Sequence, residues 1–330
     1  MGGVRLMARR HPASAALRAA LEEQPDLAVL CTHHPAAHRE LFGADRMIQL
    51  PIAENAMLGM ATGMALTGRR VLVNVARAAF LFSAFDPLVN QATKWRYLTD
   101  GQFRVPLAIR ALTRGGEHLG AQHEHVPHAM LAQVPGLVVA VPGSPNSAAG
   151  LLAAALRHPD PVVVLESPAL FAPGWESLPE PEPSPAALPF GVPNRVTDGR
   201  DVTLIGIGNT VRTVLGAATA LAGRGRAAQV VDLRTAAPLD VALLAELVSA
   251  TGCAVLVDEA PPACSLMHSV AYQLVAAGAV PPDRVRVVSG AACPAPVNPG
   301  LQAVLAPDVP AVVDAALGAL GAPTLTKGSV

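Results

Sequence analysis

The chain has 330 residues, a formal net charge of -1 and a sequence pI of about 6.8. It is 51% hydrophobic and 15% charged, which supplies enough apolar surface for a large core spread over about two domains. The near-neutral charge gives no support to a function in binding nucleic acid or an anionic membrane surface. The mean hydropathy of +0.38 indicates apolar surface beyond the needs of a monomer, so we expect a subunit interface.

The cysteines and the apolar stretches define the expected compartment. Four cysteines lie far apart and form no C-x-x-C pair, so neither a zinc finger nor a disulfide framework is predicted, and reduced thiols fit best. Gly, Pro, Arg or His interrupts every apolar stretch before the roughly 20 residues that span a membrane. No apolar signal core follows the basic N-terminus. We therefore expect a soluble, cytoplasmic protein.

Alternating apolar runs and helical patterns predict an α/β fold along the whole chain. In the first half, strands are expected at 27–30, 47–52, 71–75, 105–111, 137–141 and 162–165, and helices at 14–23, 55–66, 86–98 and 147–157. In the second half, strands are expected at 202–207, 228–232, 254–257 and 285–288, and helices at 211–222, 239–250 and 265–277. Buried strands that alternate with helices form parallel sheets covered on both faces.

A proline-dense stretch, 173–193, separates the two halves. Proline stiffens the backbone and removes amide donors, so this stretch is predicted to be a linker. The expected division is a first domain at 1–175, a linker at 176–194 and a second domain at 195–330.

Parallel sheets bind ligands at the carboxyl ends of their strands. In the first domain these ends carry Cys31 to His34, Glu54, Phe80 and Phe82, the segment 114–128, and Ser144. Glutamate, histidine and aromatic residues are thus expected together at one edge of the sheet, which predicts a functional site there.

Glu54 ends Pro51-Ile52-Ala53-Glu54, at the junction of a predicted strand and an apolar helix. One interpretation is a first-turn glutamate that complements the helix dipole. The other is an acid in a dry pocket that donates a hydrogen bond to a ring nitrogen of a heterocyclic cofactor. The aromatic run from Phe80 to Asp86 and the stretch Lys94-Trp95-Arg96-Tyr97 follow at short range, but spacing alone leaves both interpretations open.

The segment from Gly115 to His125 combines backbone freedom with groups that exchange protons near neutral pH. Four side chains in or just after this segment, His123, Glu124, His125 and His128, could reach one metal ion. Short histidine clusters are more commonly solvated loop residues, so no metal is predicted here, and the same holds for His33, His34 and His38.

The turn Gly206-Ile207-Gly208-Asn209-Thr210 follows a predicted strand and precedes a helix, and Asp232 ends the next strand. This order partly matches a dinucleotide-binding fingerprint, but Val211 occupies the third glycine position. A tight turn is therefore the preferred interpretation.

Several stretches together carry a resemblance to a known family. They include Pro51-Ile52-Ala53-Glu54, Phe80 to Asp86, Asn90 to Tyr97, the Gly-rich segment up to His123, Pro135 to Pro142, Pro161 to Glu166, Val231 to Asp240 and Val257 to Ala260. In these stretches the chain resembles the β subunit of thiamine-diphosphate-dependent 2-oxo acid dehydrogenases (pyruvate, branched-chain and acetoin types) in the transketolase superfamily. The resemblance covers nearly the whole chain.

The resemblance implies a transketolase-like pyrimidine-binding domain followed by a transketolase C-terminal domain. Glu54 would be catalytic and would hydrogen-bond the aminopyrimidine ring of thiamine diphosphate, with Phe80 and Phe82 binding the same cofactor. His123 would be the second catalytic residue and would steer protons or guide a lipoyl acceptor.

The resemblance also implies a partner. The sequence contains no Gly-Asp-Gly motif, which in the family belongs to an α subunit that holds the diphosphate and its Mg²⁺. We therefore expect an α₂β₂ heterotetramer that decarboxylates a 2-oxo acid and transfers the acyl unit to a lipoyl acyltransferase or an acyl carrier protein.

Three departures from the family pattern leave the substrate and the acceptor open. Cys31-Thr32-His33-His34 replaces the usual Gly-Glu-Asp, His123-Glu124-His125 replaces His-Ser-Gln, and Pro261 to Ser265 replaces a Gly-rich segment. They favour a role in secondary metabolism, in which a carbonyl compound is another possible acceptor. The alternative functions are the C-terminal subunit of a split transketolase or carboligase, and a non-catalytic scaffold. The retained Glu54 and His123 argue against the scaffold.

Overall fold

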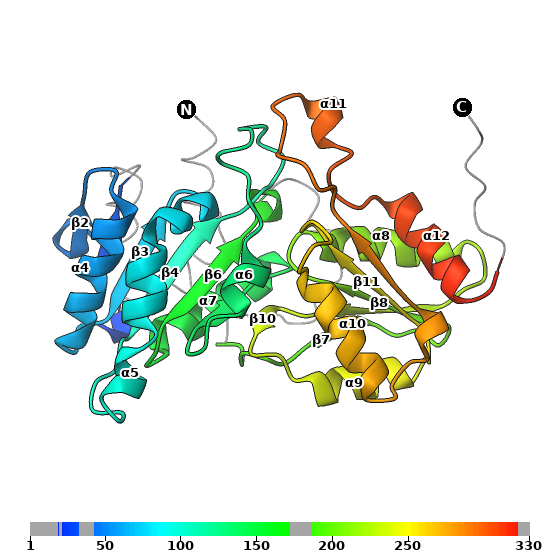
Figure 1. The fold of residues 1–330 in the computed structure, drawn as a ribbon, viewed down its shortest axis with the longest axis horizontal. Helices are drawn as coiled ribbons and strands as arrows, with labels where there is room; N and C mark the ends of the chain where they lie inside the picture. The colour runs from blue at the N-terminus through cyan, green and yellow to red at the C-terminus, as the bar shows by residue number, and fades with distance from the viewer. Residues whose placement is uncertain (1–18, 20–21, 33–42, 172–186, 323–330) are drawn as a thin grey trace.

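The computed structural model describes residues 19, 22–32, 43–171 and 187–322, and it shows two α/β units side by side (Figure 1). Most of the predicted helix 14–23 and of the predicted linker 176–194 lies outside these residues, as do His33, His34 and His38. Within the described ranges, no helix is both long and apolar enough to cross a membrane.

The first unit is built on a seven-stranded sheet with the order β10-β5-β6-β4-β3-β1-β2. Its strands are β1 (Ala28–Cys31), β2 (Met47–Gln49), β3 (Val71–Val75), β4 (Leu107–Leu112), β5 (Val138–Ala140), β6 (Val162–Glu166) and β10 (Thr235–Ala237). All neighbours pair in parallel except β10, which runs antiparallel to β5 with Thr235 opposite Ala140. The expected parallel sheet is confirmed, with one antiparallel edge strand that the sequence did not predict.

Helical segments cover both faces of this sheet. They are η1 (Ala44–Arg46), α4 (Glu54–Leu66), η2 (Ala78–Ala84), η3 (Pro87–Ala92), α5 (Trp95–Leu98), α6 (His128–Ala132), α7 (Pro145–Arg157) and η4 (Pro168–Phe171). Buried side chains of α4, η2 and η3 pack on one face, and those of α7 pack on the other.

The predicted single helix 86–98 is wrong, because the structure breaks it in two. The π-helical η3 ends at Ala92, and α5 begins at Trp95. Thr93 lies at the break, where its hydroxyl donates to the carbonyl of Val89 (2.8 Å) and its amide donates to the carbonyl of Leu88 (3.3 Å). Such side-chain bonds to the backbone compete with regular helix geometry, and apolar periodicity does not show them.

The second unit has a five-stranded sheet with the order β12-β11-β8-β9-β7. Its strands are β7 (Asn194–Thr197), β8 (Val202–Gly206), β9 (Ala228–Asp232), β11 (Ala254–Asp258) and β12 (Val285–Ser289). Only β7 is antiparallel, and its sequence, Asn-Arg-Val-Thr, is too short and polar to give a strand signal. The helices are α8 (Thr210–Ala222), α9 (Val241–Ser249), α10 (Leu266–Ala276), η6 (Pro282–Arg284), α11 (Pro299–Gln302) and α12 (Val309–Ala319).

The helices of the second unit are placed by their apolar faces and by side-chain caps. Buried residues of α8 and α12 pack on one face of the sheet, while those of α9 and α10 pack on the other. The carboxylate of Asp240 accepts from the amide of Leu243 at the start of α9, and that of Asp308 accepts from the amide of Ala311 at the start of α12. The expected helices 211–222, 239–250 and 265–277 are confirmed to within two residues at each end.

One apolar cluster joins the two units. It runs from α4 and the strands of the first sheet, through Leu233 and Ala236, to Ile205, Leu256 and Met267 in the second unit. Together with β10, which follows β9 in the chain yet completes the first sheet, this shared core fixes the two sheets against each other.

Candidate functional site

Glu54 is the first residue of α4, at the turn that follows β2. The preceding residues Pro51, Ile52 and Ala53 are exposed, whereas Glu54 is only 7% exposed. Its Oε1 atom is buried and has no hydrogen-bond partner among the described residues. A buried carboxyl oxygen normally has a hydrogen-bond partner, so this one is available to a polar group of a ligand.

The aromatic run lies beside the start of α4. The side-chain amide of Asn55 donates to the carbonyl of Ser83 (3.2 Å), which ties η2 to this helix. On η2, Phe80 stands edge-on to the ring of His123, with ring centroids 5.4 Å apart. Phe82 stands edge-on to the ring of His125 in the same way, at 5.2 Å. The predicted aromatic and histidine residues are thus brought together next to the helix that carries Glu54.

The loop after β4 is fixed at several points along its length. Near its start, the guanidinium of Arg77 forms an ion pair with Glu117. At Gly120 the backbone has φ of +84°, which side chains rarely adopt, and a Cβ atom there would lie 2.9 Å from the Cγ1 of Val297. Beyond it, Glu124 is buried and accepts a hydrogen bond from the side chain of Gln302. The loop is therefore held by both units of the chain.

His128 is not a solvated loop residue, so that interpretation is wrong for this histidine. It is 1% exposed, and its Nε2 lies 3.1 Å from the Oδ2 of Asp258, which is also buried. Burial alone would lower the pKa of His128, but the Asp258 carboxylate outweighs burial and the pKa is raised. Burial alone would raise the pKa of Asp258, but the charge and hydrogen bond of His128 lower it. The two side chains form a charged pair that joins the two units.

The four residues considered as metal ligands point to different partners. His123 and His125 contact aromatic rings, Glu124 binds Gln302, and His128 binds Asp258. Among the described residues, no three His, Cys, Asp or Glu side chains are grouped so that they could hold a metal ion.

A second polar group links the carboxyl edges of the two sheets. The Nε atom of Arg114 lies 3.6 Å from the Oε2 of Glu259, and its NH2 group donates to the carbonyl of Glu259 (3.0 Å). The side-chain amide of Asn209 donates to the Oε1 of Glu259 (2.6 Å). The carboxylate at the end of β11 is therefore saturated by residues of both units.

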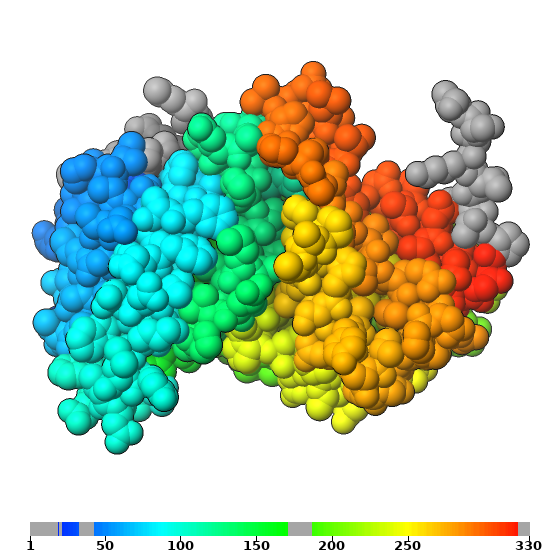
Figure 2. All heavy atoms as spheres, in the orientation of Figure 1, coloured from blue at the N-terminus to red at the C-terminus, as the bar shows by residue number. Residues whose placement is uncertain are grey.

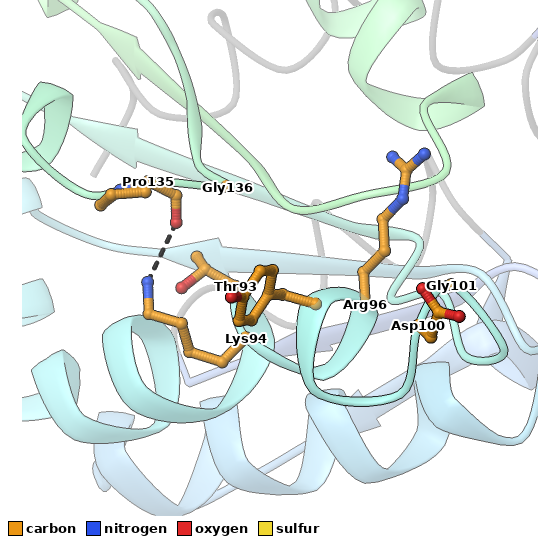
Figure 3. Close-up of a pocket in the computed structure, with 8 residues that line it drawn as sticks. Thr93, Lys94, Arg96, Asp100, Gly101, Pro135 and Gly136 are labelled. Carbon is orange, nitrogen blue, oxygen red and sulfur yellow. Dashed lines mark hydrogen bonds between the residues drawn. The ribbon is translucent and has the colours of Figure 1, made fainter.

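The stretch Lys94 to Tyr97 does not belong to this site. It precedes the amino end of β4, whereas Glu54 follows the carboxyl end of β2, so the two lie at opposite edges of a parallel sheet. A cavity of about 700 Å³ opens there, lined by Thr93, Lys94, Arg96, Tyr97, Asp100, Gly101, Pro135 and Gly136 (Figure 3). The ammonium of Lys94 donates to the carbonyl of Pro135 (3.0 Å). Although this stretch follows the aromatic run closely in the sequence, η3 carries the chain from one edge of the sheet to the other before Lys94 is reached.

The turn after β8 is a structural turn, as preferred from the sequence. The hydroxyl of Thr210 accepts from the amide of Ile207 (2.9 Å) and lies 3.0 Å from the carbonyl of Val257. Gly143 of the first unit lies against this turn, and a Cβ atom there would be 2.6 Å from the Oδ2 of Asp232. The first unit therefore packs closely against this turn and the start of α8.

Comparisons with known proteins identify the family. Residues 10–172 match the transketolase pyrimidine-binding domain, and residues 191–312 match the transketolase C-terminal domain. The chain is 36% identical over 82% of its length, and over 80% of the relative's, to the acetoin:2,6-dichlorophenolindophenol oxidoreductase β subunit of Cupriavidus necator. The chain belongs to the family of 2-oxo acid and acetoin dehydrogenase β subunits.

Two further relatives and one solved structure agree with this assignment. The Bacillus subtilis protein of the same name is 32% identical, with 86% of this chain and 82% of the relative covered. The pyruvate dehydrogenase E1 component β subunit of Rhizobium meliloti is 32% identical, with 83% and 59% covered. A split gene transketolase, described as an inactive β4 tetramer, shares the fold at 24% identity with a TM-score of 0.78, covering 94% and 97% of the chains. The family resemblance, the fold class and the assignment to an enzyme β subunit are confirmed.

The residues of this β subunit fit the cofactor of its family, thiamine diphosphate. A pyrimidine ring requires an acid that is buried and still has an unpaired oxygen, and Glu54 is such an acid. Phe80 and Phe82 lie on η2, which is tied to the start of the same helix.

The sequence did not reveal the residues that connect this edge to the second unit. Asp258 and Glu259 lie in a stretch that carried the family resemblance, but their partners are far away in the chain. Gln302 carried no signal at all, because it lies in a segment rich in proline, glycine and alanine that has no helix or strand periodicity. Glu124 gave one hint of a distant partner, because a carboxylate requires a hydrogen-bond partner if the fold buries it.

Proposed function

We propose that this β subunit acts with an α subunit in a thiamine-diphosphate enzyme that decarboxylates a 2-oxo acid and transfers the acyl unit. The observation that carries the proposal is the buried Glu54 with its unpartnered oxygen at the turn between β2 and α4. The edge-on pairs Phe80–His123 and Phe82–His125 beside the same helix support it.

In this proposal the carboxyl group of Glu54 shares a proton with a nitrogen of the cofactor's pyrimidine ring. This hydrogen bond favours the tautomer of the ring in which the exocyclic nitrogen is basic. Burial of the acid keeps water from competing for this hydrogen bond. Phe80 and Phe82 exclude water from the neighbouring surface. When bound, thiamine diphosphate supplies the nucleophilic carbon and the electron sink that decarboxylation requires.

His123 is the second proposed catalytic residue. It is half-buried, and its ring packs edge-on against Phe80 beside the helix that carries Glu54. In this proposal the imidazole steers a proton or guides the acceptor as the acyl unit leaves.

The proposed partner completes the cofactor site. No Gly-Asp-Gly motif is present in the sequence, so the diphosphate and its Mg²⁺ require ligands from another chain. An α₂β₂ heterotetramer, with the cofactor between α and β subunits, provides them. The relatives bear the name of a β subunit, which supports such an α partner.

The proposed acceptor is a lipoyl group of an acyltransferase or an acyl carrier protein. His123-Glu124-His125 replaces the family's usual His-Ser-Gln, which supports a dedicated acceptor and a role in secondary metabolism. Acetoin is a second candidate substrate, because the relatives from Cupriavidus necator and Bacillus subtilis are named for acetoin oxidation.

Calorimetric titration of thiamine diphosphate with Mg²⁺ tests the shared site. The titration is made into the isolated chain and into its mixture with a candidate α subunit. Tight binding only in the mixture, and weaker binding when Glu54→Gln is used, would support the proposal. Equal binding by the isolated chain, or binding that does not respond to Glu54→Gln, would contradict it.

Turnover assays with the same mixture separate the candidate functions. A 2-oxo acid, acetoin and a pair of sugar phosphates are each supplied with an artificial electron acceptor or a coupling enzyme. Oxidation of the 2-oxo acid or of acetoin would identify a dehydrogenase, whereas ketol transfer between sugar phosphates would identify a split transketolase. A lack of turnover despite cofactor binding would favour a scaffold.

A further inference from the structure

A segment of the second unit reaches over the proposed active-site edge of the first. After β12 the chain leaves its sheet, forms the short helix α11 and returns to α12. Figure 1 shows α11 standing beside the loop that follows β4, and Figure 2 shows the two in contact at the surface. The contact is made by Val297 against Gly120 and by Gln302 with Glu124.

The Glu124–Gln302 pair is almost completely enclosed. Glu124 is 5% exposed and Gln302 is 6% exposed. The Nε2 group of Gln302 donates to the Oε2 of Glu124 and lies 3.4 Å from the carbonyl of Pro296. The Oε1 atoms of both side chains have no partner among the described residues. The buried carboxylate therefore depends on one amide donor, and loss of that donor would leave it unpaired.

Glu124 lies between the two histidines of the proposed site. His123 packs on Phe80 and His125 packs on Phe82, both on η2 of the first unit. Glu124 instead turns to the second unit. Glu124, the middle residue, is thus bound to the second unit, whereas the imidazoles of His123 and His125 pack against the first unit. A shift of Glu124 would move both rings, because the three residues share one short piece of backbone.

We propose that Gln302 is a positioning residue, which holds Glu124 and thereby sets His123 and His125 against Phe80 and Phe82. The role of the two imidazoles in turnover rests on the function proposed above, whereas the anchoring of the loop does not. Gln302 contacts no reacting group in this proposal and acts only through Glu124.

Exchanging the two side chains provides a sharp test. Gln302→Glu places two carboxylates face to face in a buried space, where they repel each other. Glu124→Gln combined with Gln302→Glu restores one amide and one carboxylate with their places reversed. If the hydrogen bond between them is what holds the loop, the double variant should recover what Gln302→Glu loses.

Hydrogen–deuterium exchange of the full-length chain measures the anchoring directly. In Gln302→Glu, amides of the segment 115–127 are expected to exchange about tenfold faster or more, since a buried hydrogen bond to a charged group has been lost. In the double variant their exchange should return to within about threefold of wild type. The matched control is Gln273→Glu on the exposed face of α10, which should leave this segment unchanged.

Turnover assays with the α subunit test whether Gln302 positions the two imidazoles. Gln302→Glu is expected to lower kcat about tenfold or more with a smaller effect on cofactor affinity, and the double variant should restore it. Unchanged exchange in Gln302→Glu, or a double variant as defective as the single one, would overturn the proposal. If the wild-type mixture shows no thiamine-dependent turnover, the proposed function fails, while the exchange data still decide whether Gln302 anchors the loop.

Discussion

The carboxyl edges of the two sheets are built alike but used differently. At the first edge, Glu54 keeps an unpartnered buried oxygen beside an aromatic helix. At the second edge, Asp258 and Glu259 are fully engaged with His128 and Arg114 of the first unit. The comparison teaches that a strand end in an α/β sheet serves a ligand only where its polar groups are not already used to dock another part of the protein.

The largest effect is expected from a substitution at the carboxyl edge of the first sheet. In the complex with the α subunit, Glu54→Gln should lower kcat by about 10² to 10⁴, because an acid that shares a proton is replaced by an amide that cannot. Steady-state assays measure this effect, with circular dichroism to confirm an unchanged fold. Glu246→Gln, on the exposed face of α9, is the matched control and should keep full activity. Equal activities of the two variants would show that Glu54 has no catalytic role.

The next largest effect is expected from a substitution at the carboxyl edge of the second sheet. Asp258→Asn should lower the free energy of unfolding by about 3–5 kcal/mol, because it leaves a buried histidine without its counter-charge. Urea denaturation of the full chain measures the loss. The exposed Asp283→Asn serves as its control and should lie within about 0.5 kcal/mol of wild type. If Asp258→Asn were as stable as the control, the pair would not be what holds the units together.

A smaller effect is expected at the neighbouring contact. Arg114→Met should destabilise the chain by about 2 kcal/mol, since Glu259 loses a charged donor but keeps the amide of Asn209. The comparison variant is Arg226→Met on the surface, for which thermal and urea unfolding should show almost no change. A loss as large as that of Asp258→Asn would mean that the two contacts act as one cooperative unit.

The smallest effect is a dependence of stability on pH. Because the pKa of His128 is raised above its ordinary value of 6.5, its contribution is fully present below about pH 6.5 and is lost as pH rises through the folded-state pKa. Because the pKa of Asp258 is lowered below 3.8, its contribution is present above that value and is lost as pH falls through the folded-state pKa. Unfolding free energies should therefore decline above about pH 6.5, by at most about 1.4 kcal/mol per pH unit.

Asp258→Asn sharpens this pH test. Without the Asp258 carboxylate, burial is opposed only by the smaller influence of the Glu259 charge, so the pKa of His128 should fall and the decline of stability above pH 6.5 should disappear. Urea titrations of wild type and variant between pH 5 and 8 compare the two slopes. Parallel slopes would show that the pair does not titrate as described.

Much of the fold was set by short-range patterns that the sequence displays. The strands 71–75 and 228–232 were predicted to the residue, because a short, mostly apolar and β-branched run that follows an arginine-containing polar turn is typical of a strand in a covered sheet. Glu54 was placed at the start of its helix for the same reason, since the apolar run ends and helical periodicity begins at that point. The break in the predicted helix 86–98 was not visible, because side-chain bonds to the backbone leave the periodicity intact.

The α/β architecture, the family and the residues proposed to act at the first edge could all be inferred from residue patterns along the chain. Which polar groups remain available to a ligand depends instead on contacts between segments that are distant in the sequence. His128 and Asp258 are 130 positions apart, and Glu124 and Gln302 are 178 apart, yet each pair shares one buried hydrogen bond. Local propensity carries no information about such partners, because they are selected when apolar faces close on each other and every enclosed charge must find a counterpart.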